Sequence, residues 1–394
     1  MPSLLQAGRF AEARALLCVG ADEAAPITQF YLGIAVGGID GEAASCEHYE
    51  RALAVLPTLH SARNNLIRGL LKRATPASFA AALAHAEASA ELQPDAAEMR
   101  YQLGVVRMHC NDLDAAADAY EGTLEIDASH VGALVNAAHV LAQLAADGDA
   151  RQRARLLRVA RLGVAAGLWA HELQRPPHRL PELCPGRPWH DKRAFGFVAL
   201  LEAAAPQIRA ELLALRGGGG AASAAAAAPF SAVGGRAAHD ASLVAAGAWR
   251  EYPFLGGGMR HDAHCARCPV TASVLERIPE AVGCAMSGGG ESLFSCLAPG
   301  THLRAHCGST NARLTCHLGL LVPGGATIRC GTEAREWAEG ECIVFDDSFE
   351  HEVWHEGSAD RVVLLINFWH PMLPPDKRRI DMSGQAGAGE YEMI

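Results

Sequence analysis

The hydrophobic pattern divides the chain into two parts of different periodicity. From about residue 4 to about residue 170 the sequence is rich in alanine and leucine and nearly free of β-branched runs, which predicts helices. From about residue 290 it changes to short stretches of alternating apolar and polar residues that are broken by glycine and proline. Such stretches are typical of β-strands. We therefore expect a helical amino-terminal part and a β-rich carboxy-terminal part.

A repeat is visible in the helical part. Tyr49 and Tyr120 lie seventeen residues after Leu32 and Leu103, and the corresponding positions 49, 86 and 120 are separated by 37 and 34 residues. This resembles the tetratricopeptide repeat, in which a small residue lets two helices cross closely and an aromatic ring fills the gap. Residues 1–175 are therefore predicted to form an α-solenoid of three or four helix pairs. A plain helical bundle is the alternative.

Composition predicts the domain boundaries. Residues 176–188 are dense in proline and should end the solenoid. A helix is predicted from about residue 194 to residue 215, and a glycine- and alanine-rich insertion at about 216–229 is expected to be a flexible surface segment. The carboxy-terminal domain should span residues 189–382, with a tail at 383–394.

The segment at 313–320 predicts a strand with one apolar and one polar face. Leu314, Cys316, Leu318 and Leu320 point one way, and Arg313, Thr315 and His317 point the other. This pattern fits a half-buried sheet whose second face lines a polar cavity. Further strands are predicted at 327–330, 341–345 and 361–368. Strands at this spacing favour a β-sandwich or jelly roll, so the fold class is an α+β multidomain protein.

Composition also narrows the class of protein. The chain has 34 lysines and arginines against 44 aspartates and glutamates, a net charge of −10, which argues against a general nucleic-acid binder. No run of about 18 apolar residues appears, so no membrane span is expected. The first residues lack a basic segment followed by an apolar core, so we expect no secretory signal and take the cytoplasm as the default compartment.

The twelve cysteines show no repeated spacing. They are too few for a disulfide scaffold and are expected to be reduced core thiols. One tight cluster of histidine and cysteine lies at 261–268. Because a zinc site normally needs a second ligand pair, and none follows, we do not expect zinc there.

Six histidines fall between residues 302 and 370, and His306 with His351 is the best metal pair by spacing. His306 is expected in the loop before the strand that begins at Arg313. A jelly-roll iron site usually takes a histidine and an acid from one strand end and a distant histidine from another. Here Gly308 stands where the acid should be. Arg361, ten residues after His351, could bind the remote carboxylate of a keto acid. Scattered core or surface histidines would explain the same spacing.

At these positions the sequence becomes similar to a known family. The shared motifs are Pro299-Gly300-Thr301-His302, His306-x-Gly308-x-Thr310-Asn311, Arg313-Leu314-x-x-His317-Leu318-Gly319-Leu320, the run Phe345 to Trp354, and Trp369-His370-Pro371. They resemble the aspartyl/asparaginyl β-hydroxylase family from about residue 189 to residue 379. Some members of that family join tetratricopeptide-type helices to this domain. Its members bind iron through two histidines only, with glycine in place of the acid.

The resemblance implies a double-stranded β-helix that depends on Fe(II) and on 2-oxoglutarate as co-substrate. By position, His306 and His351 would ligate Fe(II). Arg361 and Ser295 would hold the distal carboxylate of 2-oxoglutarate. His317 would contact the co-substrate near the metal, and Arg313 would lie at the carboxylates of substrate or co-substrate.

Nearby acidic residues and two departures from the family qualify this expectation. Asp346, Asp347 and Glu350 could compensate for the missing acidic ligand, with a solvated turn as the alternative. Thr315 replaces a family arginine, which puts an aspartyl substrate in doubt more than the oxygenase chemistry. In animal members of the family, the cysteine at the position of Cys265 forms a disulfide with a second cysteine. Ala272 stands at the position of that second cysteine, so no disulfide is expected there.

Three functions are compatible with the sequence. The first is hydroxylation of an Asp- or Asn-type side chain of a protein or peptide, presented by the helical repeats, with 2-oxoglutarate and O2 converted to succinate and CO2. The second is the same chemistry on another substrate, such as a lipid acyl chain. The third is a non-catalytic scaffold with a degenerate jelly roll. Retention of both metal histidines and of Arg361 favours an enzyme.

Overall fold

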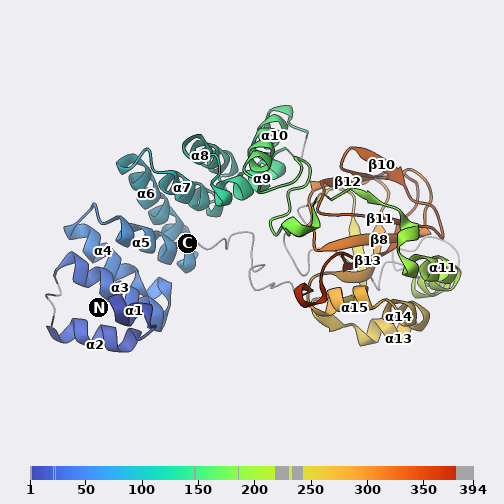
Figure 1. The fold of residues 1–394 in the computed structure, drawn as a ribbon, viewed down its shortest axis with the longest axis horizontal. Helices are drawn as coiled ribbons and strands as arrows, with labels where there is room; N and C mark the ends of the chain where they lie inside the picture. The colour runs from blue at the N-terminus through green and yellow to red at the C-terminus, as the bar shows by residue number, and fades with distance from the viewer. Residues whose placement is uncertain are drawn as a thin grey trace. The chain divides into compact units, whose positions relative to one another are not determined.

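The structure is a computed structural model that describes residues 2–20, 22, 24–145, 148–184, 186–217, 230–232 and 243–378. Most of the expected insertion at 216–229 and all of the expected tail at 383–394 lie outside the described residues. The chain divides into two compact units, Met1–Leu144 and Ala145–Ile394 (Figure 1). The division falls earlier than the end of the solenoid predicted at residue 175, because the next helix packs with the second unit.

The first unit is built of helices in the order that the repeat predicts. They are α1 (Pro2–Gln6), α2 (Phe10–Gly20), α3 (Pro26–Asp40), the short 3-10 helix η1 (Glu42–Ser45), α4 (Cys46–Val55), α5 (His60–Arg73), α6 (Pro76–Leu92), α7 (Ala97–His109), α8 (Leu113–Ile126) and α9 (Val131–Leu144). Each of them packs against its neighbours in sequence. This is the arrangement of a stacked solenoid, in which each repeat contacts the next.

Two glycine–tyrosine contacts show why the repeat has its period. A Cβ atom at Gly33 would lie 2.5 Å from Cε1 of Tyr49, and a Cβ atom at Gly104 would lie 2.5 Å from Cε1 of Tyr120. In both pairs the tyrosine occupies the space that a larger side chain on the preceding helix would need. The helices therefore cross closely at equivalent points, which confirms the tetratricopeptide-like pairing and excludes a bundle with chance spacing.

The second unit contains helices and thirteen described strands. Its helices are α10 (Ala150–Ala165), η2 (Pro181–Leu183), η3 (Lys192–Ala194), α11 (Gly196–Leu215), α13 (Asp262–Arg267), α14 (Pro269–Glu276), α15 (Pro279–Met286) and η5 (Pro375–Lys377). Its strands are β1 (Trp189–His190), β2 (Ser231–Ala232), β3 (Val244–Ala246), β4 (Trp249–Gly256), β5 (Met259–Arg260), β6 (Glu291–Leu297), β7 (Thr301–His306), β8 (Arg313–Leu321), β9 (Ala326–Cys330), β10 (Glu333–Glu336), β11 (Cys342–Phe345), β12 (His351–His355) and β13 (Arg361–Trp369).

Eight of these strands, β6 to β13, form a jelly roll. In the larger antiparallel sheet the order is β11-β8-β13-β6, and in the smaller one it is β10-β9-β12-β7. The chain passes back and forth between the sheets, so that β13 returns between β6 and β8 while β12 returns between β7 and β9. This double-wound order confirms the expected fold.

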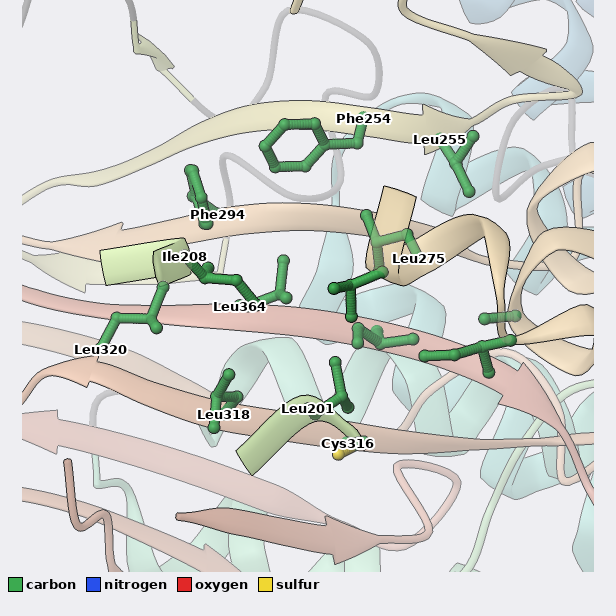
Figure 2. Packing of buried hydrophobic residues seen from close by; sticks show 14 of the residues in the cluster. Leu201, Ile208, Phe254, Leu255, Leu275, Phe294, Cys316, Leu318, Leu320 and Leu364 are labelled. Atoms are coloured by element: carbon green, nitrogen blue, oxygen red, sulfur yellow. The ribbon is translucent and has the colours of Figure 1, made fainter. Parts of the chain in front are cut away.

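The two faces of the larger sheet have different roles. Its outer face forms the main apolar core with α11, α13, α14 and α15, and includes Leu318, Leu364 and Phe294 (Figure 2). The predicted alternation in β8 is confirmed, because the residues assigned to its apolar face all lie in this core. The inner face packs on the smaller sheet and carries the candidate site residues Ser295, Arg313, His317 and Arg361. None of the described helices has both the length and the apolar character needed to cross a membrane.

Candidate metal and co-substrate site

The two predicted metal histidines lie side by side on the smaller sheet. His306 is the last residue of β7 and His351 is the first residue of β12. They are paired across these antiparallel strands, and their ring centroids are 4.1 Å apart. The prediction of a loop position for His306 is wrong, because strand pairing continues to this residue. The sheet register therefore brings together two side chains that are far apart in sequence.

Backbone hydrogen bonds fix the protonated nitrogen of both rings. Nδ1 of His306 lies 2.7 Å from the carbonyl oxygen of Arg304, and Nδ1 of His351 lies 3.0 Å from that of Phe349. A carbonyl only accepts, so each Nδ1 carries the hydrogen and each Nε2 is the unprotonated nitrogen. Burial lowers the pKa of His351, which favours the neutral ring. In their neutral forms both rings therefore present an unprotonated Nε2, the form in which imidazole binds metals.

Gly308 has no room for an acidic side chain. A Cβ atom there would lie 2.8 Å from Cγ of Asp347 and 3.0 Å from the backbone oxygen of the same residue. The amide of Gly308 also donates to that oxygen over 2.7 Å. Within the described ranges no group of three or more histidine, cysteine or acidic residues could hold a metal. A metal here would therefore have two histidine ligands.

Arg313 is held by the protein on both sides of its guanidinium. Its Nη2 donates to Oδ2 of Asp347 over 3.0 Å, and its Nη1 donates to the backbone oxygen of Gly289 over 2.7 Å. Nε of Arg313 and Oδ1 of Asp347 are buried without a hydrogen-bond partner. The pair lies beside Gly308, so it places one carboxylate close to the two histidines. The expected contact of Arg313 with a bound carboxylate stays a prediction.

Arg361, at the start of β13, is a buried cation without an anionic partner among the described residues. It is 2% exposed, and its guanidinium carbon lies 4.5 Å from the ring centroid of Trp337. Its only hydrogen bond to the described part of the chain is a long one of 3.4 Å from Nη1 to the backbone oxygen of Ser295, and its Nε has no partner there. Burial lowers the pKa of Arg361 to about 10, so the group stays protonated at neutral pH. A buried charge without a partner destabilises a protein. A bound carboxylate would pair with this guanidinium and remove that cost.

Two further hydrogen-bond donors lie on the same inner face. Trp337 Nε1 donates to Nδ1 of His317 over 3.3 Å, so the neutral His317 ring carries its hydrogen on Nε2, which is buried without a partner. Burial and the nearby charge of Arg361 lower the pKa of His317 and keep it neutral. Ser295 Oγ accepts from Trp249 Nε1 over 3.1 Å, which leaves the hydroxyl proton of Ser295 to donate elsewhere.

Comparison with known proteins identifies the family of this domain. Residues 202–371 match the sequence model of the family described as aspartyl/asparaginyl beta-hydroxylase. The carboxy-terminal unit carries a domain of this family.

Relatives of the chain bear the same name. The human aspartyl/asparaginyl beta-hydroxylase is 31% identical over 323 residues, which is 73% of this chain and 40% of that protein. The mouse aspartate beta-hydroxylase domain-containing protein 2 is 39% identical over 136 residues, 34% of this chain and 39% of that protein. The chain thus spans less than half the length of these relatives.

The solved structures that resemble the chain include helical repeat proteins. YrrB, titled a TPR protein with an unusual peptide-binding site, aligns with 42% of this chain and 81% of its own at 19% identity and a TM-score of 0.35. A TM-score this low adds nothing to what the helix pairs show by themselves.

Two tryptophans of the hydroxylase domain escaped the sequence reasoning. Trp337 stacks on the guanidinium of Arg361, and its hydrogen bond to Nδ1 fixes the tautomer of His317. Trp249 donates a hydrogen bond from Nε1 to the hydroxyl oxygen of Ser295. Neither stands in a recognisable motif: Trp337 follows a charged strand, and Trp249 opens a strand far from the histidines in sequence. Only the closure of the jelly roll brings them to the site.

The acidic turn of the hydroxylase domain is buried, so its interpretation as a solvated turn is wrong. Asp346, Asp347 and Glu350 are all buried. Oδ1 of Asp346 accepts from the amide of Ser348 over 3.0 Å. Burial raises the pKa of Asp346 to about 7, and the neighbouring charge of Asp347 adds to this rise.

The two positions that depart from the family have plain structural roles. Thr315 is 2% exposed, and its Oγ1 accepts from Nδ2 of Asn367 over 2.8 Å on the inner face between Arg313 and His317. It therefore adds a hydrogen bond where the family arginine would add a charge. Cys265 is a buried, unpaired thiol near Ala272 in the packing of α13 and α14.

Proposed function

We propose that the chain is an Fe(II)- and 2-oxoglutarate-dependent dioxygenase that hydroxylates an Asp- or Asn-type side chain of a protein or peptide. One observation supports this most strongly. Two adjacent imidazoles, which in their neutral forms have an unprotonated Nε2, lie on the smaller sheet, and the larger sheet carries Arg361, a buried cation that lacks an anionic partner among the described residues. Membership of residues 202–371 in the hydroxylase family supports the same reaction class.

His306 and His351 are the residues that would hold the iron. Imidazole is a suitable ligand for Fe(II), and the crowding at Gly308 accounts for the absence of a carboxylate ligand from this position. Asp347 would offset the charge of the metal from beside Gly308 without being a ligand itself. Its ion pair with Arg313 holds the carboxylate in place.

Arg361, Ser295 and His317 are the residues that would hold 2-oxoglutarate. A guanidinium binds a carboxylate in bidentate fashion, and the Ser295 hydroxyl and His317 Nε2–H supply further donors. Trp337 keeps Arg361 and His317 in these orientations. When iron and co-substrate are bound, they supply with O2 the oxidising power for C–H hydroxylation, with succinate and CO2 as the other products.

A protein or peptide substrate fits the helical unit. Stacked helix pairs present surfaces that are suited to peptides, and the relatives are named for aspartyl and asparaginyl hydroxylation. Thr315 provides a neutral hydroxyl near Arg313, so we expect a neutral side chain such as asparagine to be accepted at least as well as aspartate.

The test is succinate formation from 2-oxoglutarate with added Fe(II) and asparaginyl or aspartyl peptides. His306→Ala and His351→Ala should each abolish turnover. The matched control is His302→Ala, because His302 lies on the same strand but stacks on Trp354 and pairs with Glu352 instead of facing His351. A wild-type protein that bound neither Fe(II) nor 2-oxoglutarate would instead be a scaffold.

A further inference from the structure

The segment that follows α10, which includes part of the proline-dense residues 176–188 expected to end the solenoid, is tied to the end of the jelly roll that carries the two histidines. We call residues 170–184 the strap. The strap binds the loop that follows His306: the amide of His178 donates to the backbone oxygen of Ser309 over 3.0 Å. The backbone of Leu180 exchanges two hydrogen bonds with the side chain of Asn311, of 2.8 and 3.0 Å. The loop that directly follows His306 is thus held by backbone and side-chain contacts.

The strap also binds the loop that precedes His351. Gln174 is fully buried, and its Nε2 donates to Oγ of Ser348 over 2.9 Å and to Oδ2 of Asp346 over 3.3 Å. The amide of Glu350 donates to the backbone oxygen of Leu173 over 2.6 Å. The strap therefore contacts the residues next to both histidines.

Ion pairs hold the backbone next to His351 in place as well. Glu350, which directly precedes His351, is 1% exposed and contacts three arginines from three parts of the unit. Arg175 of the strap approaches it to 2.6 Å, Arg153 of α10 makes a bidentate contact of 2.6 and 2.7 Å, and Arg329 of β9 lies 3.1 Å away. A fully buried carboxylate held by this many cations fixes the backbone on which His351 stands.

We propose that the strap is part of the metal site, with Gln174 and Arg175 as positioning residues that set its affinity for metal. The Nδ1 hydrogen bond of His351 goes to Phe349, which lies inside the loop held by the strap. A shift of this loop would therefore turn the imidazole. This inference rests on the proposed function, since it takes His306 and His351 as the ligands.

The first test is a Co(II) titration of the full chain, followed by the visible absorption of the bound metal. Gln174→Leu keeps the volume but removes both donated hydrogen bonds, and Arg175→Met removes one cation from Glu350. Each should raise the Kd for Co(II) about 10-fold, the usual scale for groups that orient metal ligands. Each should also change the absorption spectrum, which a loss of overall stability alone would not do.

The matched control is Arg193→Gln. Arg193 of η3 pairs with Asp191 at 2.9 Å, but its side chain is 85% exposed, and neither residue belongs to the strap or to the loops beside the histidines. It should bind Co(II) like the wild type. If the wild type binds Co(II) and the strap variants bind it with the same affinity and spectrum, the inference is overturned while the proposed function stands. If the wild type binds no Co(II), that result contradicts the proposed function, and with it the inference that depends on it.

A second measurement uses only the wild type, so its result does not depend on whether a variant folds correctly. Amide hydrogen exchange of the wild type, with and without Co(II), reports local opening of the strap. Because coupling is reciprocal, metal binding should slow exchange in peptides that contain His178 and Leu180. Slower exchange confined to the peptides of the ligand loops, with the strap unchanged, would contradict the inference.

Discussion

At the scale of single residues, the site is defined by polar atoms that the protein buries and leaves incomplete. Arg361 Nε and His317 Nε2 are buried without hydrogen-bond partners, and both lie against Trp337. Buried polar groups are nearly always satisfied in native structures, so each unpaired group needs an explanation. A bound dicarboxylate would supply the missing hydrogen-bond partner of both atoms. The arginine could be predicted from its spacing to His351, whereas the role of Trp337 could not, because it depends on a contact made only in the fold.

Arg361→Lys tests this role of the guanidinium. A lysine keeps the charge but loses the bidentate geometry and the stacking on Trp337. We expect a rise in the KM for 2-oxoglutarate of about 30-fold, equivalent to about 2 kcal/mol, with Co(II) affinity unchanged. Arg335→Lys is the matched control, since Arg335 stacks on Trp189 at 4.3 Å away from the site. Equal effects of the two substitutions would argue against a carboxylate at Arg361.

Asp346 gives a prediction about pH. Its pKa in the folded protein is raised from 3.8 to about 7, mainly by burial, so the folded protein holds a proton that the unfolded chain releases above pH 4. The contribution of this group to stability is therefore complete below about pH 4 and is lost as the pH rises to about 7.

Asp346→Asn should remove this pH dependence. The free energy of unfolding of the variant relative to the wild type should increase between pH 4.5 and pH 8 by about 3 kcal/mol, because one pKa unit corresponds to about 1.4 kcal/mol and the shift is partly lost already at pH 4.5. Urea unfolding of the metal-free proteins at both pH values measures the difference. A difference that is the same at both pH values would show that the carboxyl group is ionised in the folded protein.

At the scale of secondary-structure elements, alternation and spacing predicted the pieces well. The strands β8, β9, β11 and β13 fall where apolar and polar positions alternate, because a sheet with one packed face imposes that pattern. The repeat was recognisable because close helix crossings need a small residue opposite an aromatic ring. The placement of His306 in a loop was wrong, since the end of a strand is set by its pairing partner, which a local pattern does not reveal.

The helix crossings can be tested with two glycines of neighbouring helices. Gly104→Ala would put a methyl group within 2.5 Å of the Tyr120 ring, and we expect it to destabilise the first unit by about 1–3 kcal/mol. Gly122→Ala would meet only the flexible end of Arg100, at 3.0 Å, and should be neutral or stabilising because alanine favours helices. Thermal unfolding measures both. Equal stability of the two variants would contradict the crossing geometry, and neither should alter Co(II) binding.

At the scale of the whole molecule, the chain consists of a helical repeat unit and a hydroxylase-family domain. The repeat region was predicted to extend to residue 175, whereas the chain divides into compact units after Leu144, because α10 continues the helical pattern but packs with the second unit. An amphipathic pattern shows that a helix buries one face, but it does not show which other part of the chain that face packs against. The partner of Arg153 is Glu350, 197 residues further along the chain, and no local signal connects them. For the same reason the contacts of the strap with the jelly roll could not be predicted from its proline-rich sequence.

The central claim is that two histidines, without an acidic ligand, hold the metal beside a carboxylate bound by Arg361. A crystal structure of the protein with Mn(II) and 2-oxoglutarate, in which anomalous scattering locates the metal, tests it most directly. We predict one metal peak bonded to Nε2 of both His306 and His351, with one carboxylate of 2-oxoglutarate on the Arg361 guanidinium. A metal bonded to other residues, or a co-substrate away from Arg361, would contradict the account.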